Sequence, residues 1–149
     1  MKQKYRKGIF VVVYSISRNN IKYLILKRKL HWKGWEFPKG AVERFETKKG
    51  AVKREIFEET EINIDKREIK KFDFSGKYNY GKVLPDRPEF KGQTFSLYSV
   101  EVKRQKIRVD GKEHSDYKWV DFDKALKMLS WQNQKKSLKK VDSYIRNGI

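Results

Sequence analysis

The first third of the chain contains two runs of apolar residues. GIFVVVYS (8–15) and KYLILKRK (22–29) are rich in β-branched and aromatic residues, which favour strands. Asn19 and Asn20 lie between the runs, and asparagine tolerates the positive φ of a hairpin turn. The apolar positions are nearly continuous, which is typical of strands buried on both faces of a sheet. We therefore expect a hairpin of two central strands.

The spacing of apolar residues becomes helical in three later segments. Val52 and Ile56 are four residues apart and Thr47 can act as an N-cap, which predicts a helix over 48–60. Helical spacing returns over 121–131, where Asp121 or Asp123 can cap the helix. The same spacing over 133–147 ends at Gly148 and predicts a third helix.

The remaining segments alternate between strand-like and loop-like composition. We expect longer strands over 69–81 and 94–102, and shorter strands over 106–111 and 117–120. An aromatic loop, LHWKGWEFPKG (30–40), follows the hairpin, and a loop with two prolines over 82–93 should be exposed and mobile. Strands mixed with helices predict an α/β (α+β) fold, with a mixed β-sheet sandwiched between helices.

Length and composition set the class of protein. A chain of 149 residues has the common size of one domain and contains no linker-like stretch, so residues 1–149 should form a single domain. No apolar run approaches the roughly 18 residues of a membrane span, and the start has no cleavable leader pattern. We expect a cytoplasmic protein with no membrane partner. The absence of cysteine excludes disulfides and thiolate metal sites.

The balance of charge is strongly basic. Lys and Arg number 37 against 19 Asp and Glu, which gives a net charge of +18. Such a field attracts polyanions, which include nucleic acid, nucleotide phosphates and anionic lipid. Solubility or a general composition bias accounts for the charge equally well, since charge alone names no substrate.

One acidic cluster stands out against this background. In a helix over REIFEE (54–59), Glu58 and Glu59 fall at about −60° and +40° from Glu55, so the three carboxylates share one face. Like charges so placed repel each other unless a cation lies among them. Oxygen ligands without sulfur favour Mg²⁺ or Mn²⁺. The alternative is a solvated acidic face paired with neighbouring lysine and arginine.

The spacing around the cluster resembles the Nudix box of the Nudix hydrolases. Glu46 follows Gly40 after five residues, and the REIFEE segment follows after seven more. The preceding strands, the aromatic loop and the segment 113–129 are also similar to that family, which implies the Nudix fold over nearly the whole chain. The pattern departs at Glu61, where the box has a glycine suited to the left-handed turn that ends the helix.

The resemblance implies a metal centre and a set of catalytic residues. A divalent ion, Mg²⁺ or Mn²⁺, would be held by the carbonyl of Gly40 and by Glu55, Glu58 and Glu59. Glu58 and Glu59 are also candidate bases. Glu113 matches a loop glutamate that supplies a further metal ligand or the base, or else is a surface acid after the turn at 110–111. Arg54, placed with the catalytic residues, and Glu46 would brace the box loop against the helix.

The resemblance also implies hydrolysis of a diphosphate linkage in a nucleoside polyphosphate. Basic positions expected to contact phosphates are Arg28 and Lys39, and residues expected near the nucleoside are Tyr78, Tyr80, Phe90 and Gln93. The alternative for the two basic residues is ordinary surface charge, and the alternative for the aromatic residues is packing within the sheet. FKGQ (90–93) resembles a feature of RNA 5′-pyrophosphohydrolases and diadenosine tetraphosphate hydrolases, and WEFPKG (35–40) is similar to decapping enzymes.

We therefore expect a pyrophosphohydrolase of dinucleoside polyphosphates or of RNA 5′ ends. Two alternatives stay open, namely an enzyme that removes nucleoside triphosphates or ADP-sugars and a non-catalytic scaffold that binds RNA or nucleotides. Such scaffolds usually lose glutamates of the box, and this chain keeps them. The sequence leaves open whether the protein is a monomer or a homodimer.

Overall fold

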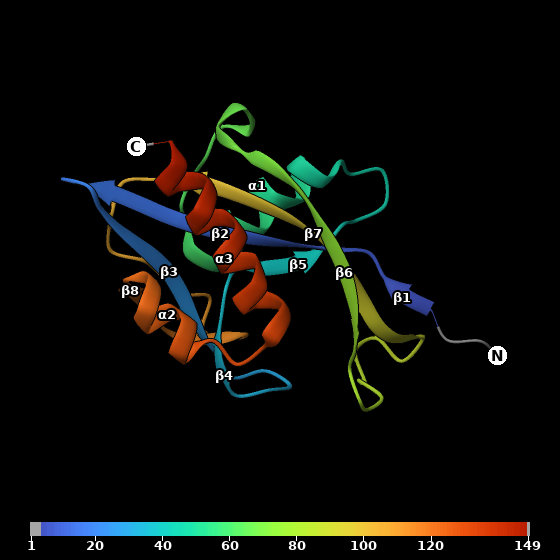
Figure 1. The fold of residues 1–149 in the computed structure, drawn as a ribbon. Coiled ribbons are helices and arrows are strands. Elements are labelled where there is room, and N and C mark those ends of the chain that lie inside the picture. The colour runs from blue at the N-terminus through green and yellow to red at the C-terminus, as the bar shows by residue number, and fades with distance from the viewer. Residues whose placement is uncertain (1–3, 149) are drawn as a thin grey trace.

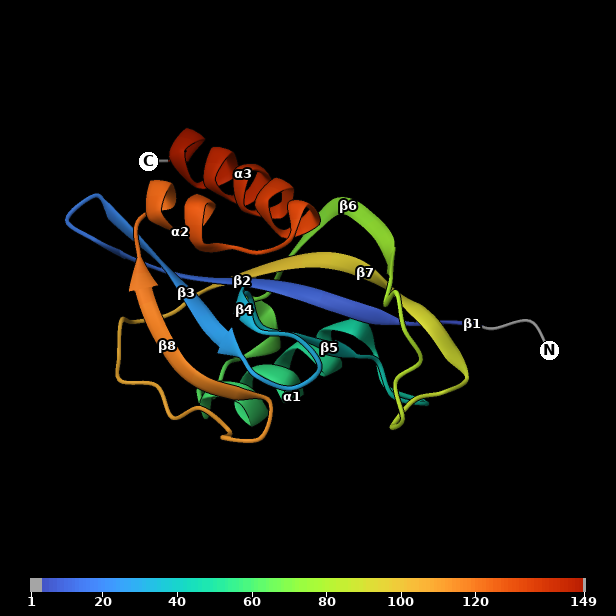
Figure 2. The ribbon, with the colours of Figure 1, turned by 90° about the horizontal axis from the view of Figure 1, so that it is seen from below.

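Helices cover both faces of one mixed, eight-stranded sheet (Figures 1 and 2). The computed structural model describes residues 4–148, so residues 1–3 and 149 of the expected domain lie outside it. In chain order the elements are β1 (Lys4–Arg6), β2 (Gly8–Ser17), β3 (Asn20–Arg28), β4 (Gly34–Glu36), β5 (Lys39–Ala41), α1 (Lys48–Thr60), the 3₁₀ helix η1 (Lys66–Glu68), β6 (Lys70–Asn79), β7 (Phe90–Glu101), β8 (His114–Val120), α2 (Phe122–Met128) and α3 (Gln132–Asn147).

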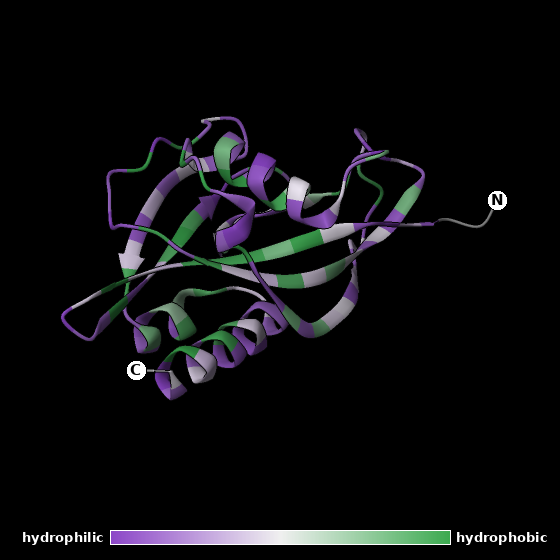
Figure 3. Ribbon diagram, turned by 90° about the horizontal axis from the view of Figure 1, so that it is seen from above, coloured by the Kyte–Doolittle hydropathy of each residue, from purple (hydrophilic) through white to green (hydrophobic). Residues whose placement is uncertain are grey.

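Strand β2 forms the centre of the sheet and separates two hydrophobic clusters. Its even-numbered side chains from Phe10 to Tyr14 pack with α2 and α3, and its odd-numbered side chains from Ile9 to Val13 pack with α1. Figure 3 shows the hydrophobic residues concentrated on the central strands and on the faces of the helices turned toward them. The continuous apolar run is therefore buried on both faces, as the sequence predicts.

The neighbours of β2 determine where the polar loops emerge. Along one edge β2 runs parallel to β7, and along the other it pairs with β5 at its start and with β3 at its end. Between those two partners, the amide of Val11 donates to the carbonyl of Pro38 at 2.9 Å. Strands β3 and β5 thus diverge, and the aromatic segment between them passes over the start of β2.

Helix α1 has the bounds that the sequence predicts. The Thr47 side chain accepts a hydrogen bond from the amide of Gly50 at the start of the helix. Buried Ala51, Val52 and Ile56 hold the helix against the sheet. Glu61 ends it in the left-handed conformation with φ 61°, so the turn keeps its geometry without the glycine of the box.

Three sequence expectations need correction. Residues 106–111 form no strand, because β8 and not this segment pairs with β3, and Ile107 instead packs in the cluster beside α1. The aromatic loop contains the short strands β4 and β5. The expected loop over 82–93 is shorter, since Phe90–Gln93 belong to β7 and Leu84 is buried.

The two helices near the C-terminus cover the second face. Asp121 caps α2 by accepting from the amide of Lys124 at 2.9 Å, and α3 buries Leu138, Val141 and Ile145. Of the helices within residues 4–148, none is long and apolar enough to cross a membrane.

Glu61→Gly should stabilise the protein. A left-handed conformation costs a residue with a Cβ roughly 1–2 kcal/mol, and the larger unfolded-state entropy of glycine offsets roughly half of that gain. We expect the free energy of unfolding to rise by up to about 1 kcal/mol, or about 2–4 °C in melting temperature. Chemical and thermal unfolding measure this. Glu61→Ala, which keeps the strained φ, is the control, and equal stability of the two variants would contradict the prediction.

Candidate functional site

Strand β5 and helix α1 bring the two halves of the box together. Strand β5 pairs with the start of β2, and α1 packs beneath both strands. A Cβ added to Gly40 would lie 2.1 Å from the carboxyl carbon of Glu55. Because only glycine leaves room there, the Glu55 carboxyl can lie directly against the strand.

Arg54 ties the box loop to the helix. Its guanidinium donates to the Glu46 carboxylate at 2.8 Å and to the carbonyl of Ala41 at 2.8 Å. The hydrogen bonds between Arg54 and Glu46 lower the pKa of the Glu46 carboxyl and raise the pKa of the Arg54 guanidinium. Both groups therefore stay charged over the ordinary pH range, and they fix the loop that precedes α1.

The three glutamates of the cluster have different environments. Glu59 is 1% exposed, and neither of its carboxylate oxygens has a hydrogen-bond partner among residues 4–148. Burial, with the nearby charges of Glu55 and Glu113, raises the pKa of Glu59 well above its ordinary value. Burial also raises the pKa of Glu55 to about 7, although Arg54 opposes the shift. The Glu58 side chain is 54% exposed and contacts Arg54 at 3.2 Å.

The loop before β8 adds a further carboxylate to this region. Three potential metal-ligand atoms lie within 4.8 Å of one another, one each from Glu59, Glu113 and His114. The carbonyl of Gly40 accepts a hydrogen bond from Gln93 at 3.3 Å. Buried carboxylate oxygens without partners are donors that suit a hard divalent cation such as Mg²⁺ or Mn²⁺. The residues present therefore fit the metal that the box implies.

A buried ionic network that the sequence analysis missed is centred on Glu36. This carboxylate is 1% exposed, and it contacts Arg28 at 3.3 Å, Lys39 at 3.4 Å and His114 at 2.9 Å. Burial opposes its ionisation, but the charge of Lys39 and the hydrogen bond to His114 outweigh burial and lower the pKa of Glu36 to about 2. Arg28 also contacts Glu113 at 3.3 Å. In the sequence, the feature that could have indicated a buried role for Glu36 is its place between the aromatic residues Trp35 and Phe37.

Some of these charged groups line a small cavity of about 50 Å³, whereas Glu58 and Glu59 are not among its lining residues. Its lining contains Arg28, Lys39, Gly40, Glu55, Glu113, Tyr78, Tyr80 and Gln93, together with Arg6, Trp32, Ala41 and Arg87. All of the expected substrate-binding residues except one thus lie here. Phe90 is not among the described residues that line the cavity, because it lies at the start of β7, opposite Lys4.

An aromatic cavity of about 100 Å³ adjoins the charged one. Both are lined by Trp32, Lys39, Tyr78 and Tyr80, and the aromatic cavity adds Phe10, Asn79, Trp131, Asn133 and Gln134. The Gln134 side chain is fully buried, and its carbonyl accepts from the Phe37 amide at 2.8 Å. In the part of the chain that the structure describes, the Gln134 amide nitrogen and the Asn133 Oδ1 have no hydrogen-bond partners. A free donor and a free acceptor among aromatic rings suit a planar heterocycle.

A carboxylate cluster that can hold a metal, beside a cavity with basic side chains, is the arrangement typical of a hydrolase of phosphate anhydrides. The family model of the NUDIX domain matches residues 4–141. The chain therefore belongs to the Nudix hydrolase family, and it acts on pyrophosphate bonds.

Several relatives share most of the chain. The dihydroneopterin triphosphate diphosphatase of Haemophilus influenzae is 29% identical over 147 residues, 94% of this chain and 89% of that protein. An RNA pyrophosphohydrolase of Nitratiruptor sp. is 32% identical over 127 residues, 81% of each chain. The crystal structure of a Nudix hydrolase from Listeria monocytogenes matches with a TM-score of 0.78 at 20% identity, covering 98% of this chain and 97% of that one. The expected Nudix fold is thus confirmed.

Glu59→Gln should stabilise the metal-free protein above neutral pH. An acid whose folded pKa is raised contributes stability below its unfolded pKa, and that stability is lost as the pH rises through the folded pKa. Removing the unpaired charge should therefore raise the free energy of unfolding at pH 8 by on the order of 1–3 kcal/mol, and by less at pH 5. Thermal melts in EDTA measure this.

Added Mg²⁺ should make the wild type more stable than Glu59→Gln, which reverses their order in EDTA. Added Mg²⁺ should raise the melting temperature of the wild type and leave Glu59→Gln nearly unchanged, because a ligand stabilises the state that binds it. Glu58→Gln, which changes a solvated carboxylate, is the control and should not gain stability in EDTA. A wild type more stable than Glu59→Gln in EDTA at pH 8 would contradict the assignment.

Proposed function

We propose that this Nudix pyrophosphohydrolase is metal-dependent and uses water to hydrolyse a phosphoanhydride bond of the triphosphorylated 5′ end of RNA. The observation that carries the proposal is the junction of two cavities, one lined by carboxylates and basic groups and one by aromatic rings. A polyphosphate matches the first and its attached nucleoside the second. Residues 4–148 would perform this reaction as a single domain.

The carboxylate side of the junction would hold the metal. Glu55, Glu58, Glu59, Glu113 and the carbonyl of Gly40 are the proposed ligands. A bound Mg²⁺ or Mn²⁺ neutralises phosphate oxygens and lowers the pKa of a water molecule. Glu58 and Glu113 are the more exposed of these carboxylates, so they are placed to accept a proton from water that enters from solvent. Arg54 and Glu46 would keep the ligand loop in place.

The basic side would orient the phosphates. Arg28 and Lys39 are buried, and Glu36 fixes both side chains by direct ion pairs. Burial opposes the charge of Lys39, but Glu36 outweighs burial and raises the pKa of Lys39, so the ammonium stays protonated. Fixed cations in a water-poor site stabilise developing charge on a phosphate without rearranging.

The aromatic cavity would bind the first nucleoside. Trp32 and Tyr80 offer ring faces, with centroids 5.9 Å apart. The free amide of Gln134 and the free Oδ1 of Asn133 would meet an acceptor and a donor on the edge of a base. Gln93 would act through its hydrogen bonds to Gly40 and Tyr80.

Two other substrates contain the same chemistry. The Haemophilus relative is named for dihydroneopterin triphosphate, whose pterin is also a planar heterocycle. A dinucleoside tetraphosphate likewise joins a nucleoside to a polyphosphate. We favour RNA because the net charge of +18 exceeds what a small nucleotide requires, and because the Nitratiruptor relative is named an RNA pyrophosphohydrolase.

Glu58→Gln should abolish turnover while leaving the fold intact, because it removes a ligand and a candidate base. Glu113→Gln should lower kcat at least about tenfold, the usual scale for a general base. Product release with saturating Mg²⁺ measures both. Asp123→Asn, which changes an exposed acid on α2 outside the site, is the control. Full activity of Glu58→Gln would overturn the metal assignment.

A substrate comparison tests the choice of RNA. Triphosphorylated RNA, diadenosine tetraphosphate and dihydroneopterin triphosphate are offered separately with Mg²⁺ and then Mn²⁺, at about 50 and about 200 mM salt. RNA should have the highest kcat/KM at low salt, and its advantage should shrink at high salt as counterions screen the basic surface. A preference for either small substrate at both salt concentrations would refute RNA as the substrate.

A further inference from the structure

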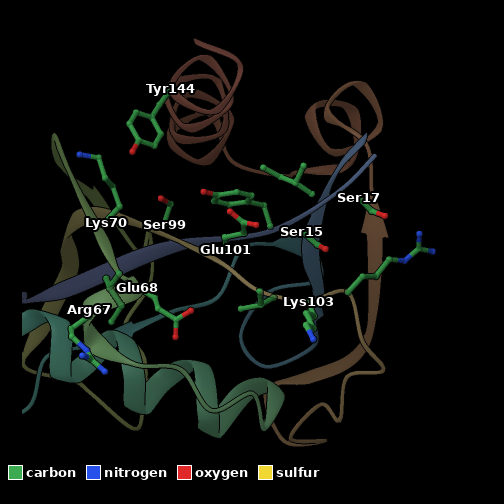
Figure 4. Close-up of a pocket in the computed structure, with 14 residues that line it drawn as sticks. Ser15, Ser17, Arg67, Glu68, Lys70, Ser99, Glu101, Lys103 and Tyr144 are labelled. Carbon is green, nitrogen blue, oxygen red and sulfur yellow. The ribbon is translucent and has the colours of Figure 1, made fainter. Parts of the chain in front are cut away.

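A large hollow lies away from the carboxylate cluster of α1. This groove, of about 900 Å³, is formed where β2 and β7 end and β6 begins, beside the end of α3 (Figure 4). Its rim includes four basic residues, Arg67, Lys70, Lys103 and Arg104, against two acidic ones, Glu68 and Glu101. Since β2 reaches the aromatic cavity with Phe10 and the groove with Tyr14, the two sites lie at different ends of one strand.

The groove contains a buried hydroxyl without a partner. Ser99 is 1% exposed, and its Oγ makes no hydrogen bond within the described residues. Lys70 of β6 pairs with Ser99 of β7, and its ammonium lies over the ring of Tyr144 from α3 at 5.0 Å, so the three side chains lie beside one another in the groove (Figure 4). Two hydroxyls and an ammonium in one place are the groups that bind a phosphate.

Strand β6 connects the groove with the catalytic cavity. Lys70 at its start lines the groove, and Tyr78 near its end lines both cavities of the site. Ammonium groups lie over aromatic rings along the way: Lys70 over Tyr144 at 5.0 Å and over Phe72 at 5.8 Å, Lys140 over Phe74 at 5.2 Å, and Lys39 over Tyr78 at 5.2 Å. The rings of β6 thus share one face, which is bordered by α3.

We infer that β6 and α3 form a track for single-stranded RNA, which runs from the catalytic cavity to the groove at Ser99. This inference rests on the proposed function, because it places the 5′ end of the same RNA in the catalytic cavity. Single strands bind where cations track phosphates and aromatic faces stack with bases, and the alternating lysines and rings supply both.

The length of the track favours RNA over a small ligand. Ten residues of β6 span roughly 30 Å at the usual rise of a strand, which is much longer than a mononucleotide. The rings of Phe72, Phe74 and Tyr78 pack against the hydrophobic core and are only partly exposed, so they provide no apolar anchor for a lipid surface. The RNA segment downstream of the 5′ end is the occupant that matches the length and the charge.

Binding of an RNA that cannot be hydrolysed tests the track directly. An RNA of about twelve nucleotides with a 5′-hydroxyl is titrated by fluorescence anisotropy at several salt concentrations. Replacing Lys70→Gln and Lys140→Gln together should reduce the salt slope by about 1.4, since each contact to a single strand contributes about 0.7. The matched control, Lys112→Gln with Lys127→Gln, removes two exposed charges elsewhere and should leave the slope unchanged. Equal slopes for the two double variants would overturn the track.

Variants of Tyr144 test the contribution of stacking separately from that of charge. Tyr144→Leu keeps apolar packing on Phe72 but loses the ring, and it should weaken binding of this RNA roughly tenfold. Tyr144→Phe keeps the ring and loses only the hydroxyl, so it should weaken binding by less than Tyr144→Leu does. Wild-type affinity of Tyr144→Leu would remove Tyr144 from the track.

Turnover separates the track from the proposed function. The kcat/KM for triphosphorylated RNA should be higher for about twelve nucleotides than for three, and the Lys70/Lys140 variant should lose this difference while cleaving the short RNA normally. Length-independent cleavage would overturn the track and leave the function standing. Binding of the 5′-hydroxyl RNA that depends on Lys70 and Lys140, without cleavage of triphosphorylated RNA, would support the track and refute the function.

Discussion

Burial of the Glu59 carboxyl beneath the central sheet is the constraint on which the rest of the site depends. Helix α1 packs through Val52 and Ile56, and this packing carries the Glu59 side chain into the protein interior, where neither oxygen finds a partner. A buried unpaired carboxylate is costly, so the group stays protonated or gains a cation. Hydrophobic packing thus places an unpaired carboxyl where the proposed metal would bind, and binding of that metal would recover the stability lost at Glu59.

The positive side of the site is arranged by a second buried carboxylate. Glu36 is ionised because Lys39, His114 and Arg28 surround it, and in return it fixes two cations beside the acidic cluster. In the proposed function, these two regions of opposite charge would give a polyphosphate and its metal distinct positions. Strand β6 likewise contributes to two sites, with Tyr78 in the charged cavity and Lys70 in the distant groove.

The sequence by itself determined the features that rest on local rules. Apolar runs fixed the two central strands, and Thr47 with the spacing of Val52 and Ile56 fixed α1 to the residue. Residue spacing also indicated the box and the family, which the match to residues 4–141 confirms. The cap at Asp121 was one of two alternatives, because either aspartate can accept from a free amide at the start of a helix.

Only the tertiary structure decided which distant residues meet. The segment 106–111 reads as a strand, yet it has no strand partner, because β8 occupies the edge of β3. Glu36 and Gln134 are ordinary polar residues in the sequence. They become part of the site because Glu36 meets His114 of β8, and because Gln134 at the start of α3 accepts from the amide of Phe37, just after β4. Phe90 has an aromatic ring that could stack on a base, but it lies beside β1 and not in the cavity. Periodicity reports which face of an element is buried, whereas pairing across more than 50 residues depends on the whole sheet.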